Sequence, residues 1–179
     1  MSPSPSEQPM VLHIEDDRGT ARLIKAMMGY NHISTLQGTS PADLERLIPD
    51  TDHIRVAILD GRVIHGTAID LLEILAAHDR LATRFEIWKN RAIPPGKIMA
   101  VLYSAGVNGE TTSRLWDQFE HGYLFAGSTK SDSPLDFAEA LSPVIKTGEI
   151  PVGFPFLKRT SEQFWRREVT SVWGSPLLD

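Results

Sequence analysis

Val11-Leu12-His13-Ile14-Glu15-Asp16 is a short apolar run that ends in two acidic residues, and Val56-Ala57-Ile58-Leu59-Asp60 is a second apolar run that ends in one. Continuous apolar runs of this length are typical of parallel strands buried on both faces. Each acidic group therefore follows directly on a predicted strand. In an open α/β sheet, the carboxyl ends of the strands form the crevice where ligands bind, so we expect Glu15, Asp16 and Asp60 to lie together there.

Three carboxylates gathered at one edge would repel one another unless a hard divalent cation joined them. Oxygen ligands with waters in octahedral geometry suit Mg²⁺ best, so these residues predict a magnesium site. A carboxylate beside such an ion can also act as a nucleophile toward a phosphoryl group. An alternative interpretation is that Glu15 and Asp16 merely stabilise the start of the following helix through its dipole.

The remaining pattern alternates strands with helices. Helical spacing predicts helices over about 18–29, from Ser40-Pro41 to before Pro49, over about 67–81, about 111–120 and about 134–146. Strands are expected near 10–15, 32–36, 54–60, 98–103 and 122–126, and residues 83–97 lack a regular pattern apart from a turn at Pro94-Pro95-Gly96. A fivefold alternation implies an α/β fold, a parallel sheet with helices on both faces.

Four segments, in order, resemble the receiver domains of two-component response regulators. They are residues 12–24 with the acidic pair, 57–60 with the helix-forming 69–75, Val101-Leu102-Tyr103-Ser104-Ala105, and Gly122-Tyr123-Leu124-Phe125. The resemblance implies a flavodoxin-like, doubly wound, five-stranded parallel sheet with about five helices over residues 10–147. Residues 1–9 are predicted to be a disordered leader and 148–179 an aromatic-rich extension.

The resemblance also assigns roles. Glu15, Asp16 and Asp60 would hold Mg²⁺, and Asp60 would accept a phosphoryl group from a histidine kinase or phosphotransfer protein. Ser104 would hydrogen-bond the phosphoryl oxygens, and Tyr123 would be the aromatic that responds to this contact. The structural alternative for Tyr123 is an ordinary core residue, and that for Ser104 is an ordinary serine at the end of a strand.

This chain departs from the receiver pattern in three places. Counting without gaps puts Ala126 where receivers place a lysine, and Lys130 lies four residues later. Lys130 would serve the site if its loop folds back on the acids. Ile64 and Ala68 stand where receivers usually carry Pro and Gly, which leaves the shape of the loop after Asp60 open. Arg62 is a candidate substitute for the lysine cation, and the alternative is that it is an exposed loop residue. His65 is a second residue that could lie near the site, with the same alternative.

Composition narrows the class of protein. The chain has 179 residues and no cysteine, and the lack of cysteine excludes disulfides and thiolate metal sites. Its net charge of −5 argues against nucleic-acid binding, which needs a basic surface. No apolar run approaches the length of a membrane span, so a cytoplasmic protein is expected. In the extension, Trp165, Val169, Val172 and Trp173 fall at helical spacing. We expect this segment to pack on its own domain, or to form a homodimer or partner contact.

Three functions remain open. The first is a phospho-accepting receiver that signals by docking to a downstream partner or by dimerising, with no turnover of a small-molecule substrate. The second is a pseudo-receiver that binds proteins without phosphorylation, suggested by Ala126, Ile64 and Ala68. The third is an aspartate-nucleophile phosphatase. Such phosphatases carry a second Asp two residues after the nucleophile, and Arg62 at that position argues against this function.

Overall fold

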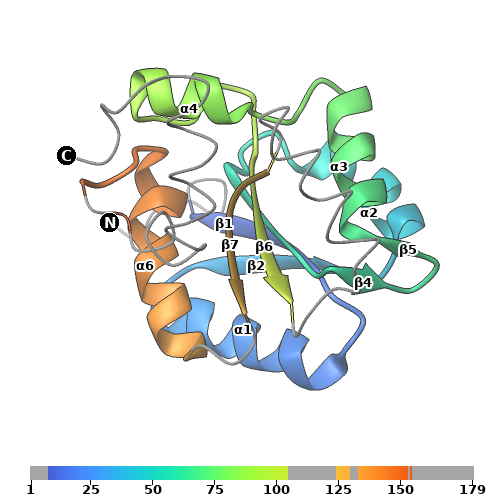
Figure 1. Cartoon of the computed structure of the whole chain (residues 1–179). Coiled ribbons are helices and arrows are strands. Elements are labelled where there is room, and N and C mark those ends of the chain that lie inside the picture. The colour runs from blue at the N-terminus through green and yellow to red at the C-terminus, as the bar shows by residue number, and fades with distance from the viewer. Residues whose placement is uncertain (1–7, 105–123, 130–132, 153, 155–179) are drawn as a thin grey trace.

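Five parallel strands form one central sheet in the order β2-β1-β3-β6-β7 (Figure 1). The computed structural model describes residues 8–104, 124–129, 133–152 and 154. The strands are β1 (Met10–Ile14), β2 (Ser34–Gly38), β3 (Val56–Leu59), β6 (Met99–Ser104) and β7 (Leu124–Thr129). The sheet confirms the predicted α/β fold, although β2 begins two residues later than the sequence pattern indicates.

Five α-helices surround the sheet in the described part of the chain. They are α1 (Arg18–Tyr30), α2 (Pro41–Leu47), α3 (Ala68–Ala77), α4 (Arg84–Asn90) and α6 (Pro134–Thr147), and a 3₁₀ turn follows α2 at Ile48–Asp50. Ser40 caps α2, with Pro41 in its first turn, and the α-helix ends before Pro49, as predicted. The helix expected at 111–120 and most of the leader lie outside the described residues.

Alternating side chains of the strands build one core on each face of the sheet. Val11, Val56, Ile58 and Val101 belong to the core with α1 and α6, whereas Leu12, Ile14, Ala57 and Leu59 belong to the core with α2 and α3. This division follows from the period of two along a strand. The strands are apolar on both faces because helices cover both.

Helix α4 is a correction, because residues 83–97 were expected to lack regular structure. Thr83 and Glu86 form a reciprocal cap at its start: the Thr83 N–H donates to Glu86 Oε2 at 2.8 Å, and the Glu86 N–H donates to Thr83 Oγ1 at 3.1 Å. This is the Ser/Thr-x-x-Glu capping box, a sequence signal that our helix assignment overlooked. The expected turn follows the helix, with Lys97 N–H donating to the Pro94 carbonyl oxygen.

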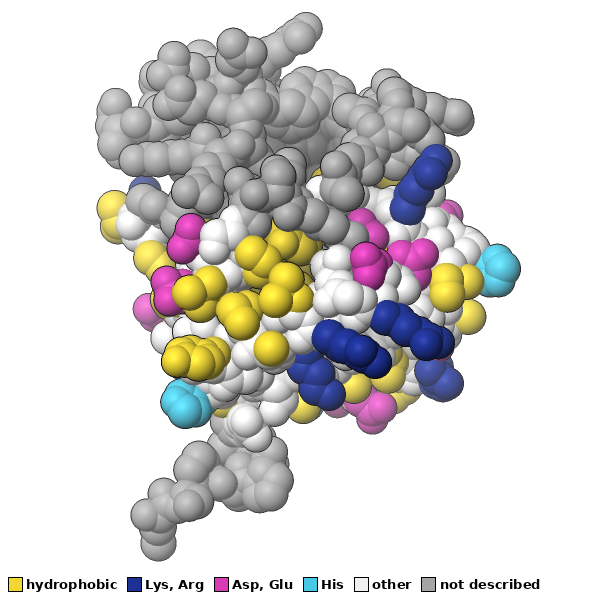
Figure 2. All heavy atoms as spheres, turned by 90° about the horizontal axis from the view of Figure 1, so that it is seen from below, with side chains coloured by type: hydrophobic (Ala, Val, Ile, Leu, Met, Phe, Trp, Pro, Cys, Tyr) yellow, Lys and Arg dark blue, Asp and Glu magenta, His cyan; other side chains and the backbone are white. Residues whose placement is uncertain are grey.

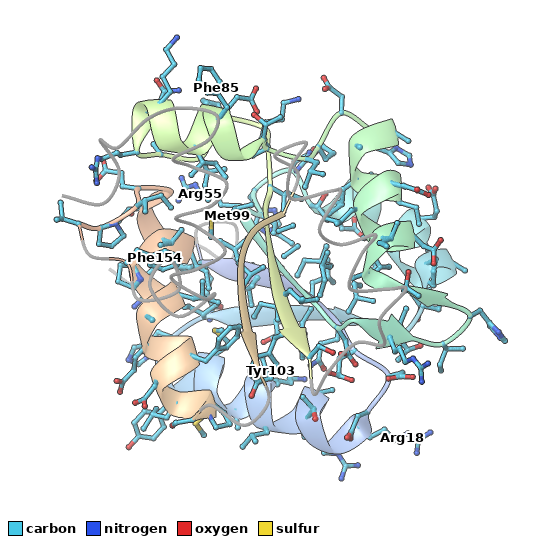
Figure 3. All side chains as sticks on the ribbon, viewed as in Figure 1. Arg18, Arg55, Phe85, Met99, Tyr103 and Phe154 are labelled. Atoms are coloured by element: carbon cyan, nitrogen blue, oxygen red, sulfur yellow. The ribbon has the colours of Figure 1, made fainter. Side chains whose placement is uncertain are left out.

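The first residues of the predicted extension pack on their own domain. Ile93 N–H donates to the Gly148 carbonyl oxygen at 2.7 Å, and Ile150 N–H donates to that of Arg91 at 2.9 Å. Phe154 is 1% exposed and joins the core beside α6, toward Arg55 and Met99 (Figure 3). This contact lies at the end of the sheet opposite the arrowheads of β6 and β7, where α4 also lies. Residues 155–179 lie outside the described part.

Phe137→Ala is expected to lower the free energy of unfolding by about 3–5 kcal/mol, because it empties a large buried site. Phe137 on α6 is 1% exposed, and its ring centroid lies 4.4 Å from that of Tyr103 on β6. Urea unfolding measures the effect as a lower midpoint at unchanged slope. Leu135→Ala, two residues earlier on the same helix and 40% exposed, is the matched control and should change stability by less than about 1 kcal/mol.

Candidate functional site

The predicted acidic cluster forms at the carboxyl ends of β1 and β3. Glu15, Asp16 and Asp60 each offer one carboxylate oxygen, and the three oxygens lie within 4.8 Å of one another. Glu15 is 2% and Asp60 6% exposed, whereas Asp16 is exposed. Figure 2 views the molecule from this end and shows acidic side chains gathered near lysine or arginine side chains. The strand-end argument therefore placed all three residues correctly.

Backbone pairing fixes the positions of these acids. Asp60 N–H donates to the Ile14 carbonyl oxygen at 3.0 Å, which continues the pairing of β3 with β1 past the last strand residue. Glu15 N–H donates to the Gly38 carbonyl oxygen at 2.9 Å, which continues the pairing of β1 with β2. Glu15 and Asp60 thus stand on neighbouring rigid strands.

The cap of α1 is formed by a different residue, Asp17. Its Oδ1 accepts from the Gly19 N–H at 2.7 Å and from the Thr20 N–H at 3.3 Å. Glu15 Oε1 accepts from the Asp17 N–H at 2.9 Å, which orients the glutamate within the acidic loop. The alternative interpretation of Glu15 and Asp16 as the helix cap is therefore not needed to explain how α1 begins.

The donor set fits a hard divalent cation. Three carboxylates so close together, two of them buried, carry a charge that is costly to concentrate without a counter-ion. Oxygen donors with one open, exposed side suit Mg²⁺, which keeps several of its waters. Glu15, Asp16 and Asp60 are the residues that would hold it.

Ser104 lies at the end of β6 beside this cluster and is 6% exposed. Because Leu59 pairs with Leu102, the same register places Asp60 next to Tyr103, one residue before Ser104. Ser104 in turn pairs with Thr129, the last residue of β7. The predicted switch aromatic, Tyr123, and Lys130 lie outside the described residues.

Ala126, which a gap-free count puts at the lysine position of receivers, pairs with Val101 within β7. The pairing of β7 with β6 is irregular between Ala100 and Val101. In the sequence, Lys130 directly follows Thr129, the strand partner of Ser104. The count that places Ala126 at the lysine position stays a prediction.

A short hairpin follows the buried Asp60. Its strands are β4 (Arg62–Val63) and β5 (Gly66–Thr67), and sequence analysis did not predict them. Val63 is buried, whereas Arg62, Ile64 and His65 are exposed. Arg62 forms no ion pair with Asp60, so the proposed substitute cation is not in place. His65, the second of the two residues at the hairpin tip, adopts a φ of 60° in the left-handed region.

A hollow of about 300 Å³ adjoins the acids on the side of β2. It runs from Glu15 and Asp16 along the start of α1 to Thr39 and Asp43 in the loop between β2 and α2. The acidic residues therefore border a solvent-accessible space rather than a closed core.

Comparisons with known structures identify the fold. The receiver domain of the Francisella response regulator 1452 superposes with a TM-score of 0.53 at 22% identity, over 77% of this chain and 97% of that one. A receiver domain protein from Clostridium thermocellum gives 0.55 at 17%, over 76% and 93%. One from Methanospirillum hungatei JF-1 (CheY-like) gives 0.56 at 13%, over 77% and 94%. No family model and no curated sequence matches the chain.

These likenesses confirm the predicted flavodoxin-like receiver fold, at low sequence identity. In the described residues, no helix is both long and apolar enough to cross a membrane.

Proposed function

We propose that the chain is a response-regulator receiver that accepts a phosphoryl group on Asp60. The observation that carries this proposal is the cluster of Glu15, Asp16 and Asp60 at the carboxyl edge of the sheet, with their ligand oxygens within 4.8 Å. The fold shared with receiver domains supports it. The donors that fit this role are a histidine kinase or a phosphotransfer protein, and a cytoplasmic location suits both.

Phosphoryl transfer requires mainly positioning and charge stabilisation from the protein. An oxygen of Asp60 attacks phosphorus in line with the bond to the donor's imidazole nitrogen, and that P–N bond breaks with its electron pair on nitrogen. Asp60 is held for this attack by its strand-end hydrogen bond to Ile14. When bound, Mg²⁺ would neutralise charge on the carboxylates and the phosphoryl oxygens. We assign Ser104 as a hydrogen-bond donor to those oxygens and Lys130 as the residue that pairs with them.

The signal would leave the domain by docking to a downstream protein. Phosphorylation replaces the single negative charge of the Asp60 carboxylate with about two on the phosphoryl group, and the added charge and oxygens bias a two-state surface near Ser104 and β7. We assign Tyr123 as the aromatic residue coupled to this change. Nucleic-acid binding and turnover of a small-molecule substrate are not part of the proposal. A homodimer through residues 148–179 stays a prediction for the part beyond Phe154, since Ile150 and Phe154 are buried in their own domain.

The test of the proposed function is intact-protein mass spectrometry with phosphoramidate or acetyl phosphate. We expect a gain of one phosphoryl mass that requires Mg²⁺ and is prevented by EDTA, because the acidic cluster needs a counter-ion before a dianionic group can approach. A second arm uses a phosphorylated histidine phosphotransfer protein as donor. Failure of every donor would contradict the proposal.

A second candidate function is a pseudo-receiver, a protein-interaction module that is not phosphorylated. The hairpin after Asp60 favours it, because Ile64 is 43% exposed at the edge of the acidic site and offers an apolar contact. A stable phosphoaspartate in the mass experiment would exclude this function.

A further inference from the structure

The loop between β2 and α2 touches both segments that carry the acidic site. The Gly38 carbonyl oxygen accepts from the Glu15 N–H at 2.9 Å, and the Thr39 carbonyl oxygen accepts from the Ile64 N–H at 3.0 Å. Ile64 belongs to the turn of the hairpin that begins two residues after Asp60. Successive carbonyl groups, of Gly38 at the end of β2 and of Thr39 in the loop after it, therefore support the loop of Glu15 on one side and the hairpin after Asp60 on the other.

Asp43, in the first turn of α2, holds Thr39 in place. Its Oδ2 accepts from the Thr39 N–H at 2.8 Å and from the Thr39 hydroxyl at 2.9 Å. Its Oδ1 accepts from Arg46 Nη2 at 2.7 Å. The backbone and side-chain hydrogen bonds from Thr39 are the main reason that the pKa of Asp43 lies below its usual value. The charged form of Asp43 is thus the form that binds Thr39.

The contacts around this loop leave little space. A Cβ at Gly38 would lie 2.9 Å from the Asp43 Cβ, and a Cβ at Gly66 would lie 2.6 Å from the Pro41 Cγ. Figure 1 shows the β4–β5 hairpin beside α2. The hairpin therefore packs closely on the start of α2, in addition to its hydrogen bond with Thr39.

We propose that Asp43 is a positioning residue for the acidic site, acting through Thr39 on the hairpin that follows Asp60. In the described structure the Asp43 carboxylate binds Thr39 and Arg46 rather than the three acids, but it borders the same hollow as Glu15 and Asp16. Because a ligand set binds a cation best when its geometry is fixed in advance, loss of Asp43 lets the acidic loops move and weakens the cation site. The part of this inference that concerns the cation rests on the proposed function.

Asp43→Ala tests the role with two measurements. The first is the hydrogen-exchange rate of the Ile64 and Glu15 amides in metal-free protein, which should rise about tenfold or more for Ile64. The second is the Mg²⁺ dissociation constant by calorimetry, which should increase about 10- to 100-fold, as for other residues that orient metal ligands. Asp43→Asn keeps the size and one acceptor oxygen and should give intermediate values.

Two matched variants separate positioning from ordinary helix stability. Ser40→Ala removes the hydrogen bond that Ser40 Oγ accepts from the Asp43 N–H at 3.1 Å and leaves the Thr39 contacts intact. Arg46→Ala removes the partner of the other Asp43 oxygen. Ser40→Ala should lower the melting temperature, because the N-cap is lost. Neither variant should change Ile64 exchange or the Mg²⁺ dissociation constant.

The outcomes are distinguishable. If Asp43→Ala lowers the melting temperature as Ser40→Ala does but leaves Ile64 exchange and Mg²⁺ affinity at the wild-type values, Asp43 only caps α2 and the inference is overturned. If the wild-type chain binds no Mg²⁺, the proposed function fails, while the exchange rates in metal-free protein still decide whether Asp43 positions the hairpin.

Discussion

Asp60→Asn is expected to abolish the phosphoryl adduct completely, with no measurable gain in mass under conditions that label the wild-type chain. The amide has no carboxylate oxygen to attack phosphorus, so the nucleophile itself is lost. Asp60 is also the only one of the three clustered acids in the described structure that is both buried and followed by the β4–β5 hairpin. Asp50→Asn, at an exposed aspartate in the 3₁₀ turn, is the matched control and should be labelled normally.

The same substitution should have opposite effects on stability without and with metal. The three carboxylates each place an oxygen within 4.8 Å of the others, so removing one of them relieves repulsion. The free energy of unfolding of metal-free Asp60→Asn should therefore be about 1 kcal/mol higher than that of the wild-type chain. Saturating Mg²⁺ stabilises the wild-type chain through mass action, by about 2.7 kcal/mol at 100 times the dissociation constant. Asp60→Asn should lose most of this gain.

Denaturant unfolding with EDTA and with Mg²⁺ measures both effects. If Asp60→Asn destabilises the metal-free protein and responds to Mg²⁺ like the wild type, the three carboxylates do not form a cation site. Continued labelling of Asp60→Asn would mean that another residue accepts the phosphoryl group.

The acidic site could be predicted from sequence because its geometry follows from few rules. Glu15, Asp16 and Asp60 each follow a buried apolar run, and adjacent parallel strands bring their carboxyl ends to one edge. Ser104 was expected from the resemblance to receivers, and the structure places it at the end of β6, which pairs with β3. No assumption about loops or side-chain packing was needed for the three acids.

Features that depend on loops were harder to predict. The β4–β5 hairpin has only two residues per strand and no Asn-Gly or Asp-Gly turn, and its support comes from Thr39, which is distant in sequence. The role of Asp43 was missed for the same reason, because its contacts with Thr39 look like an ordinary start of α2. Helix α4 was not predicted although Thr83 and Glu86 signal its start, because its seven residues are too few to form a long apolar stripe.

The lysine of the site is the part that a sequence count leaves open. A gap-free count from Ser104 or Tyr123 puts Ala126 where receivers carry this lysine, and the structure places Ala126 within β7, opposite Val101. Lys130 lies outside the described residues. The assignment of Lys130 to the site is a prediction that substitution of this lysine tests.

Lys130→Ala is therefore expected to slow phosphorylation of Asp60 by about 100-fold, the usual cost of removing one donor that stabilises charge in a transition state. Lys130 follows Thr129 in the sequence, and Thr129 pairs with Ser104 at the end of β6. The proposed function assigns its ammonium group to the phosphoryl oxygens. The rate is measured by intact mass against time with phosphoramidate and Mg²⁺. The melting temperature of Lys130→Ala should stay near the wild-type value, which separates loss of a cation from loss of folding.

Lys146→Ala provides the control, because Lys146 is an exposed lysine in the last turn of α6, on another element. Its phosphorylation rate should equal that of the wild-type chain. If Lys130→Ala also reacts at the wild-type rate, Lys130 does not serve the site. In the described structure, Arg62 forms no ion pair with Asp60 and does not replace this lysine. Of the groups assigned to the site, Mg²⁺ and Ser104 would then stabilise the phosphoryl group. We would expect the phosphoryl signal to be short-lived or weakly transmitted.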